Sequence, residues 1–219
     1  MGLFTSAIPV LIAYIALLLA VGALIKSAVN APWRLLEAPT VFSAWCAFII
    51  LLTMVWRLRI NVSSDLSLHL MGLSLFPLMF GRALASLGLS LTVIAYTAQF
   101  NGLWSNLGLN LLLLAIMPAW FSDVILRATQ RFLPHHLFVY LFGNGFFGSM
   151  AVLSLSGLCS IAAHMLWASP AGSMSDAIAY MLLLAWGESF MVGFLVTIFA
   201  VYRPNWLLTF NDSIYLRGR

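Results

Sequence analysis

Long hydrophobic runs alternate with short polar interruptions along this chain. The runs extend over residues 5–25, 40–56, 66–100, 104–126, 137–167 and 177–202. About 20 apolar residues make a helix long enough to cross the ~30 Å hydrocarbon core of a bilayer. A single helix over residues 66–100 would be about 52 Å long, so we expect two short spans that meet near Gly81 and Arg82. The pattern therefore predicts an all-α integral membrane bundle of six to seven transmembrane helices.

Two of these runs contain residues that disturb a regular helix. Pro118 is expected to kink its helix, because proline lacks the backbone N–H that the helical ladder uses. The run 137–167 is long for one crossing, and Gly143-Asn144-Gly145 is expected to break it near its start. We therefore expect irregular helices in the second half of the chain.

Composition leaves little room for a domain outside the membrane. Of the 219 residues, 63% are hydrophobic and 7% are charged, whereas soluble domains are roughly 25% charged. We therefore expect a single transmembrane domain over residues 1–219 with a short polar cytoplasmic tail at 203–219. The first run follows no charged leader region, so we expect it to remain as a helix. An ATP-hydrolysing domain would have to belong to another polypeptide.

Positive charge predicts the orientation of the bundle. The tail carries Arg203, Arg217 and Arg219, which places it in the cytoplasm by the positive-inside rule. Counting back through seven spans puts the N-terminus outside, although Arg57 and Arg59 then also lie outside, against the rule. The expected location is the bacterial inner membrane, crossed several times.

Polar side chains within the runs are candidates for function, because a bilayer makes them costly. Glu188, Arg82 and Asn110 are the intramembrane polar residues that we single out. Glu188 is expected to face the bundle interior and to have a polar partner there. It could be protonated, it could pair with an arginine such as Arg82, or it could lie on an ion path.

Histidines and a carboxylate indicate a possible metal site near the outer face. Asp65 and His69 are four residues apart, so at the start of a helix they share one face and could ligate a divalent metal. His164 is expected at the same depth. The alternative is structural: Asp65 caps the helix, and both histidines form hydrogen bonds at the membrane surface. His135-His136 is a weaker candidate, since neighbouring helical side chains diverge.

The stretch from Ser64 to Pro118 carries a set of short motifs. His69 opens a His-x-x-Gly element that ends at Gly72, an apolar pair follows, and Leu107-Gly108-Leu109-Asn110 comes after Gly102. In this order and spacing the stretch resembles the CbiM-type permeases. These are substrate-binding membrane components of energy-coupling factor transporters for cobalt and nickel.

The resemblance implies where a metal would bind. In the family the ligands come from an N-terminal Met-His segment and from the histidine that opens the His-x-x-Gly element. His69 matches that histidine, whereas Gly2 stands where the family has the other one. The missing ligand would be replaced by His164 or by the amine of Met1. We therefore expect His69 to lie within about 8 Å of His164 or the N-terminus, close enough for ~2.0–2.1 Å metal–nitrogen bonds to form after modest ring movement.

The leading interpretation is a substrate-capture permease subunit of an energy-coupling factor transporter, with a divalent transition metal such as cobalt or nickel as cargo. Its expected partners are membrane lipids, another membrane subunit and separate cytosolic ATPases. Nucleic acid is not expected as a partner. The alternative is an accessory or assembly subunit of a larger membrane redox complex. No hydrolase, phosphate-loop or haem-attachment motif occurs in the sequence, so we expect neither an enzyme nor a resident cofactor.

Overall fold

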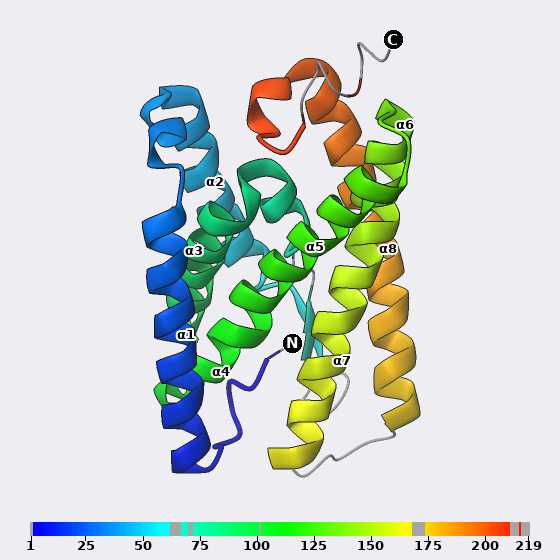
Figure 1. Ribbon diagram of the computed structural model, residues 1–219. Coiled ribbons are helices and arrows are strands. Elements are labelled where there is room, and N and C mark those ends of the chain that lie inside the picture. Colours follow the sequence, from blue (N-terminus) through cyan, green and yellow to red (C-terminus); the bar gives the residue numbers. More distant parts are fainter. Residues whose placement is uncertain are drawn as a thin grey trace.

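The computed structural model describes residues 2–61, 67–69, 72–100, 102–167, 174–210 and 215. Long helices lie side by side and run between the two ends of the molecule (Figure 1). Within the described residues, five helical stretches are long and apolar enough to cross a membrane, and the shorter apolar helix α2 (Pro39–Val55) accompanies them. The prediction of an all-α membrane bundle is confirmed.

The surface of the bundle is apolar where lipid would cover it. Large hydrophobic side chains point outward from the long helices, for example Leu18, which is 74% exposed, and Phe194, which is 66% exposed. Water would disfavour so much contiguous apolar surface, whereas acyl chains accept it. The chain is therefore a multi-pass membrane protein in a lipid environment.

The first two helices form an antiparallel pair. α1 (Val10–Asn30) and α2 are joined by the short helix η1 (Trp33–Glu37). We predicted that the first helix would start at residue 5, but α1 starts at Val10. Residues 2–9 form a non-helical segment whose Leu3 and Ile8 are buried, and the helix extends farther at its other end.

A short hairpin follows α2. β1 (Arg59–Asn61) pairs antiparallel with β2 (Ser67–His69), and Arg59 lies opposite His69. The prediction that His69 opens a helix is therefore wrong. Gly72 has a φ of 63°, a left-handed conformation that separates the strand from the next helix and that glycine adopts without strain. That helix starts only at Leu75.

α3 (Leu75–Gln99) contains a reversal of the chain. Gly81 has φ 74° and ψ 168°, values outside any helix. A Cβ placed on Gly88 would lie 2.5 Å from the Phe76 ring, so the short arm 75–80 packs against the arm that follows Gly81. The predicted break near Gly81 is confirmed. The predicted pair of spans is corrected, because six residues of helix reach only about 9 Å.

The second half of the chain consists of three long helical passes. The first comprises η2 (Trp104–Asn106), α4 (Leu107–Leu111), η3 (Leu112–Ile116) and α5 (Met117–Phe132). The second comprises α6 (Leu137–Val139), η4 (Tyr140–Gly148) and α7 (Ser149–Trp167), and the third is α8 (Met174–Tyr202), followed by η5 (Pro204–Trp206). α1 starts at the lower end of the bundle in Figure 1, and α8 ends at the upper end.

Pro118 disturbs its helix by widening it. The π-helical segment η3 directly precedes this proline, whose missing N–H cannot continue the α-helical ladder. The hydroxyl of Ser156 donates to the Leu113 carbonyl at 2.8 Å. A hydroxyl of a neighbouring helix thus satisfies a carbonyl in the irregular stretch.

The break predicted at Gly143-Asn144-Gly145 is wrong, because the helix continues through this sequence as the π-helical segment η4. Asn144 accepts a hydrogen bond from the Thr129 hydroxyl at 2.9 Å. A Cβ on Gly145 would lie 3.5 Å from the Gly193 Cα. The glycines therefore allow η4 to pack closely against α8 rather than to turn.

The polar tail closes over the short arm of α3. The amide of Leu208 donates to the Met79 carbonyl at 2.8 Å, and the Thr209 hydroxyl donates to the Leu78 carbonyl at 2.5 Å. The Tyr140 hydroxyl lies 2.8 Å from the same threonine oxygen. Because the helix stops at Gly81, these carbonyls have no helical partner, and the tail supplies the donors.

We expect Thr209→Val to destabilise the protein by about 1–3 kcal/mol, the cost of leaving a buried acceptor unsatisfied. Thermal unfolding of the detergent-solubilised protein measures the effect. Thr197→Val is the matched control, because the exposed Thr197 bonds only within its own helix, to the Gly193 carbonyl at 2.8 Å. Equal stability of the two variants would show that the tail does not cap the arm.

Candidate functional site

The N-terminal segment, residues 2–9, folds back from the start of α1 into the bundle (Figure 1). Two asparagines one turn apart hold it. Asn110 accepts from the Leu3 amide and donates to the Leu3 carbonyl, both at 2.9 Å. Asn106 donates to the carbonyls of Leu3 at 3.0 Å and Ser6 at 2.6 Å. The two amide side chains therefore act as a strand partner for an extended backbone.

The two asparagines supply the hydrogen bonds that the backbone of the N-terminal segment needs inside the bundle. An extended segment carries N–H and C=O groups that find no water inside a bundle and must be satisfied by protein. Asn106 and Asn110 are both 0% exposed. The Leu103 amide adds a further bond to the Phe4 carbonyl at 2.9 Å. The segment is thus fixed in position over its first several residues.

Gly2 fits a place that no side chain could occupy unchanged. Its φ is 106°, and a Cβ built on it would lie 2.7 Å from Phe4 Cε2 and 2.9 Å from Leu114 Cδ1. Atoms of Phe4 and Leu114 therefore fill the space beside the position where the resembling family has a histidine. The side chains around Gly2 are therefore packed for a glycine and not for a histidine.

The segment lies between the end of α7 and the region before the hairpin. Leu3 and Ile8 pack with Ala163, and Trp167 lies against the same cluster. On the other side the Phe4 ring is 4.9 Å from the ring of Tyr96, which is 5.7 Å from the ring of Trp56. Trp56 precedes β1 by three residues. The fold thus gathers the N-terminal segment, the hairpin region and the end of α7.

His164 is held in a defined orientation. Its side chain is nearly buried, and its Nδ1 lies 3.0 Å from the Ser160 carbonyl. A carbonyl can only accept, so Nδ1 carries the proton and donates. In the neutral ring Nε2 then holds the lone pair, and a histidine of this tautomer ligates a metal through that nitrogen.

The remaining predicted ligands lie partly outside the described part of the chain. Met1 and Asp65 are outside the described residues, and so is the side chain of His69. The strand pairing fixes the backbone of His69 opposite Arg59. The expected distance between His69 and His164 or the N-terminus therefore stays a prediction.

Glu188 faces the interior, as predicted. It is 1% exposed, and its Oε1 accepts from the Gly72 amide at 2.5 Å. Gly72 is the end of the His-x-x-Gly element, three residues after His69. The carboxylate of α8 therefore anchors the chain directly after the proposed metal ligand.

Arg82 is not the partner of Glu188. Its Nη1 lies 3.3 Å from an Asp123 oxygen, and Arg127 approaches the same oxygen at 2.9 Å. The reversal at Gly81 brings Arg82 beside α5 rather than toward the middle of α8. Of the three readings left open for Glu188, pairing with Arg82 is wrong.

Sequence reasoning missed Asn106 and identified Asn110 only as an intramembrane polar residue. The spacing of four between them places both on one helix face and could have suggested a pair. Their partners could not be inferred, because they are backbone groups about a hundred positions away. His136 has a local role, since its Nδ1 accepts from the Phe138 amide at 3.2 Å at the start of α6.

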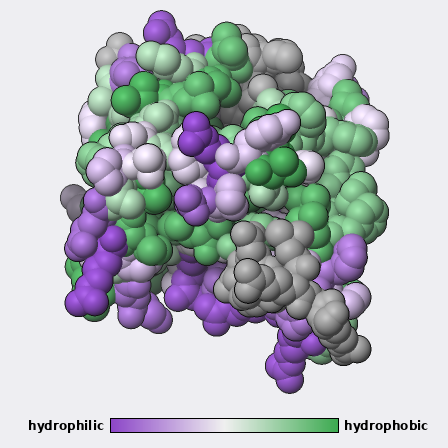
Figure 2. All heavy atoms as spheres, turned by 90° about the horizontal axis from the view of Figure 1, so that it is seen from above, coloured by the Kyte–Doolittle hydropathy of each residue, from purple (hydrophilic) through white to green (hydrophobic). Residues whose placement is uncertain are grey.

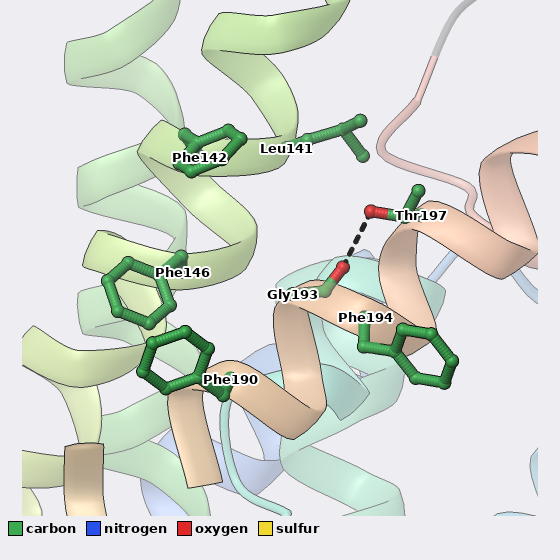
Figure 3. Close-up of a pocket in the computed structure, with 7 residues that line it drawn as sticks. All are labelled: Leu141, Phe142, Phe146, Phe190, Gly193, Phe194 and Thr197. Atoms are coloured by element: carbon green, nitrogen blue, oxygen red, sulfur yellow. Dashed lines mark hydrogen bonds between the residues drawn. The ribbon is translucent and has the colours of Figure 1, made fainter. Parts of the chain in front are cut away.

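An apolar cavity lies elsewhere in the molecule, between η4 and α8 (Figure 3). Its volume is about 340 Å³. It is lined by Leu141, Phe142, Phe146, Phe190, Gly193, Phe194 and Thr197. Apolar rings offer no ligand to a divalent cation. Across the described ranges, no group of three His, Cys, Asp or Glu side chains could hold a metal ion.

Comparison with known proteins agrees with this architecture. A family model described as "Cobalt uptake substrate-specific transmembrane region" matches residues 3–206. A solved structure described as a transition metal transporter has a TM-score of 0.72 at 14% identity, covering 91% of this chain and 92% of that chain. A truncated transition metal transporter has a TM-score of 0.72 at 15% identity, covering 92% and 98%. No curated protein matches the sequence significantly.

Fold and site together define a multi-pass membrane protein whose extended N-terminal segment is held inside a helical bundle. The family model covers nearly the whole length, so the chain belongs to the CbiM family of cobalt-uptake membrane components. It is a permease component for a metal ion. The resemblance inferred from the motifs between Ser64 and Pro118 is thereby confirmed.

We expect Asn110→Ala to loosen the N-terminal segment, because the buried Leu3 amide loses its acceptor at a cost of about 1–3 kcal/mol, while the Leu3 carbonyl keeps only the bond from Asn106. Hydrogen exchange at the Leu3 amide and thermal unfolding report the change. Asn30→Ala is the control, since the exposed Asn30 donates only to the Lys26 carbonyl one turn earlier, at 2.7 Å. Unchanged exchange at Leu3 in Asn110→Ala would contradict the anchoring role.

Proposed function

We propose that this chain is the substrate-capture subunit of an energy-coupling factor transporter and that its cargo is a divalent transition metal ion. The observation that carries the proposal is the N-terminal segment, which five hydrogen bonds from two buried asparagines hold inside the bundle. Such anchoring fixes the position of the chain next to Met1. A fixed segment between the hairpin and α7 is what a small ion needs for ligands to converge on it.

His69 would be the anchor ligand, with His164, Asp65 and the Met1 amine as partners. The orientation of His164 supports this set, because the ring donates through Nδ1 to the Ser160 carbonyl and therefore carries its lone pair on Nε2. The packing of Leu3 against Ala163 supports it as well, since these residues are close in sequence to Met1 and His164. Imidazole nitrogens, an amine and a carboxylate suit borderline divalent ions such as cobalt and nickel.

Transport energy would come from outside this chain. Separate cytosolic ATPases would act through another membrane subunit, and this chain would carry out no enzymatic step. Arginines in the tail support a cytoplasmic C-terminus in the bacterial inner membrane. On this orientation the metal would enter from the opposite, external end, where α1 begins.

A second candidate is an accessory subunit of a larger membrane redox complex that transports nothing. The packing at Gly2 favours it, because the second imidazole of the family would force Phe4 and Leu114 to shift and would sit at a φ of 106° that is strained for any side chain. Both candidates share the fold. They differ in whether the purified chain binds a metal ion.

Metal binding by the purified full-length chain tests the proposal. We expect about one Co²⁺ or Ni²⁺ ion per chain by equilibrium dialysis with elemental analysis. His69→Ala should weaken binding by at least tenfold, since even outer-shell partners of a metal are worth roughly 10- to 100-fold in affinity. His135→Ala is the control, because it removes an exposed imidazole near Tyr215 in the tail.

Two results would overturn the assignment. If the wild-type chain binds neither ion, or if His69→Ala binds as tightly as His135→Ala, the metal site proposed here does not exist. The accessory function would then be the better description. Isolation of the chain from its native membranes with redox subunits rather than ATPases would point the same way.

Glu188 should act on metal affinity through the loop that carries His69. We expect Glu188→Leu to lose at least about tenfold in affinity, because the Gly72 amide loses its acceptor and the loop its anchor. Glu188→Gln keeps an acceptor oxygen at the same position and should bind metal nearly as the wild type does. Equal losses in both variants would show that the carboxylate charge matters, not its hydrogen bond to Gly72.

A further inference from the structure

A cluster of cations surrounds one tryptophan away from the proposed metal site. The Lys26 Nζ lies 5.6 Å from the centre of the Trp120 ring, and the Arg82 Cζ lies 5.1 Å from it. Arg127 joins the group through Asp123, whose Oδ2 it approaches at 2.9 Å. Three helices, α1, α3 and α5, therefore contribute to one basic cluster.

The charges within this cluster do not balance. Lys26, Arg82 and Arg127 carry three positive charges, and Asp123 is the carboxylate that bridges the two arginines. Two cations that share one aromatic ring repel each other unless an anion lies nearby. The cluster is accessible, because Lys26 is exposed and the side chain of Arg127 is 66% exposed. It is therefore suited to an external anion.

The basic cluster lies at the end of the bundle, at the level where lipid headgroups meet a membrane protein. Lys26 lies near the end of α1, and Arg82 follows the reversal at Gly81, where the tail also contacts the short arm. This end of the bundle carries hydrophilic side chains, with hydrophobic areas between them (Figure 2). Trp120 is 37% exposed. Tryptophan beside lysine and arginine is typical of the membrane–water boundary.

Apolar surface continues next to the cations. Val29 is 78% exposed and lies one turn after Lys26, and Val124 is 58% exposed and lies one turn after Trp120. A phospholipid presents a phosphate and acyl chains side by side, and this surface offers cations and aliphatic groups in the same order. A soluble acidic peptide would match the cations alone.

We propose that Lys26 and Arg82, which lie over Trp120, together with Arg127, which joins them through Asp123, bind the phosphate headgroup of an anionic phospholipid. The guanidinium groups and the ammonium donate to the phosphate oxygens, and the exposed valines contact the acyl chains. On the orientation proposed above the site faces the cytoplasmic leaflet, which carries anionic lipid. Lipid bound there would bridge α1, α3 and α5 and would neutralise the excess positive charge.

Native mass spectrometry of the full chain, titrated with dioleoylphosphatidylglycerol in detergent, tests the site. The variant Lys26→Gln/Arg127→Gln should bind this lipid roughly 25-fold more weakly than the wild type, since each basic residue contributes about fivefold near such a surface. The control is Arg131→Gln/Arg203→Gln. It removes the same charge, but each of its arginines lies over a ring that no second cation is seen to share in the described structure, Phe132 at 5.5 Å and Trp206 at 5.9 Å.

The control variant should bind the lipid as the wild type does. Equal weakening in both double variants would mean general charge attraction and would overturn the site. Displacement of the lipid by inorganic phosphate at the same concentration, or tighter binding of a glutamate-rich peptide, would also overturn it, in favour of a free anion or an acidic protein. If Lys26→Gln/Arg127→Gln unfolds at a lower temperature than the wild type, the single variant Lys26→Gln should still lose about fivefold in affinity for the lipid.

Discussion

Inside a bilayer, every backbone N–H and C=O that is not part of a helix must find a partner within the protein. In the described part of the chain, three non-helical places inside the bundle have this demand met by a side chain or by the tail. Asn106 and Asn110 satisfy the extended N-terminal segment. Glu188 satisfies Gly72 after the hairpin, and Leu208 with Thr209 satisfies the short arm before Gly81.

The same constraint explains where the proposed site lies. A helix presents side chains on its outside and cannot bring its own backbone or terminus to a point in the interior. The extended N-terminal segment and the hairpin can do so, and both are located where helices end. The bundle thus supplies a rigid frame, and the non-helical segments within it carry the positions next to His69 and Met1. Loss of an anchor would therefore affect the site before it affects the long helices.

The sequence predicted the features that depend on local pattern. Hydrophobic runs located the long helices, and Gly81 correctly marked a reversal, because a polar Arg82 after glycine interrupts an otherwise continuous run. The hairpin and the inward fold of residues 2–9 were not predicted. At the second strand of the hairpin, the sequence Leu66-Ser67-Leu68-His69 alternates apolar and polar residues, a strand pattern that was overlooked. Residues 2–9 carry no such signal, and their fold depends on contacts with Asn106 and Asn110, which are far away in sequence.

The histidine motif was recognised from His69 and Gly72, yet the full set of metal ligands could not be identified from the sequence. Gly2 showed which imidazole is missing, and the structure adds why it cannot simply be restored: a side chain there would collide with Phe4 and Leu114. The asparagines that hold the segment are nevertheless present, and both form hydrogen bonds with its backbone. A segment that had lost all purpose would not need two buried amides to fix its backbone, since apolar residues at these positions would pack without any polar group to satisfy. The anchoring thus argues that the location of the first residues still matters, and on the metal-site proposal the Met1 amine would be the group there that ligates the ion without the second-position histidine.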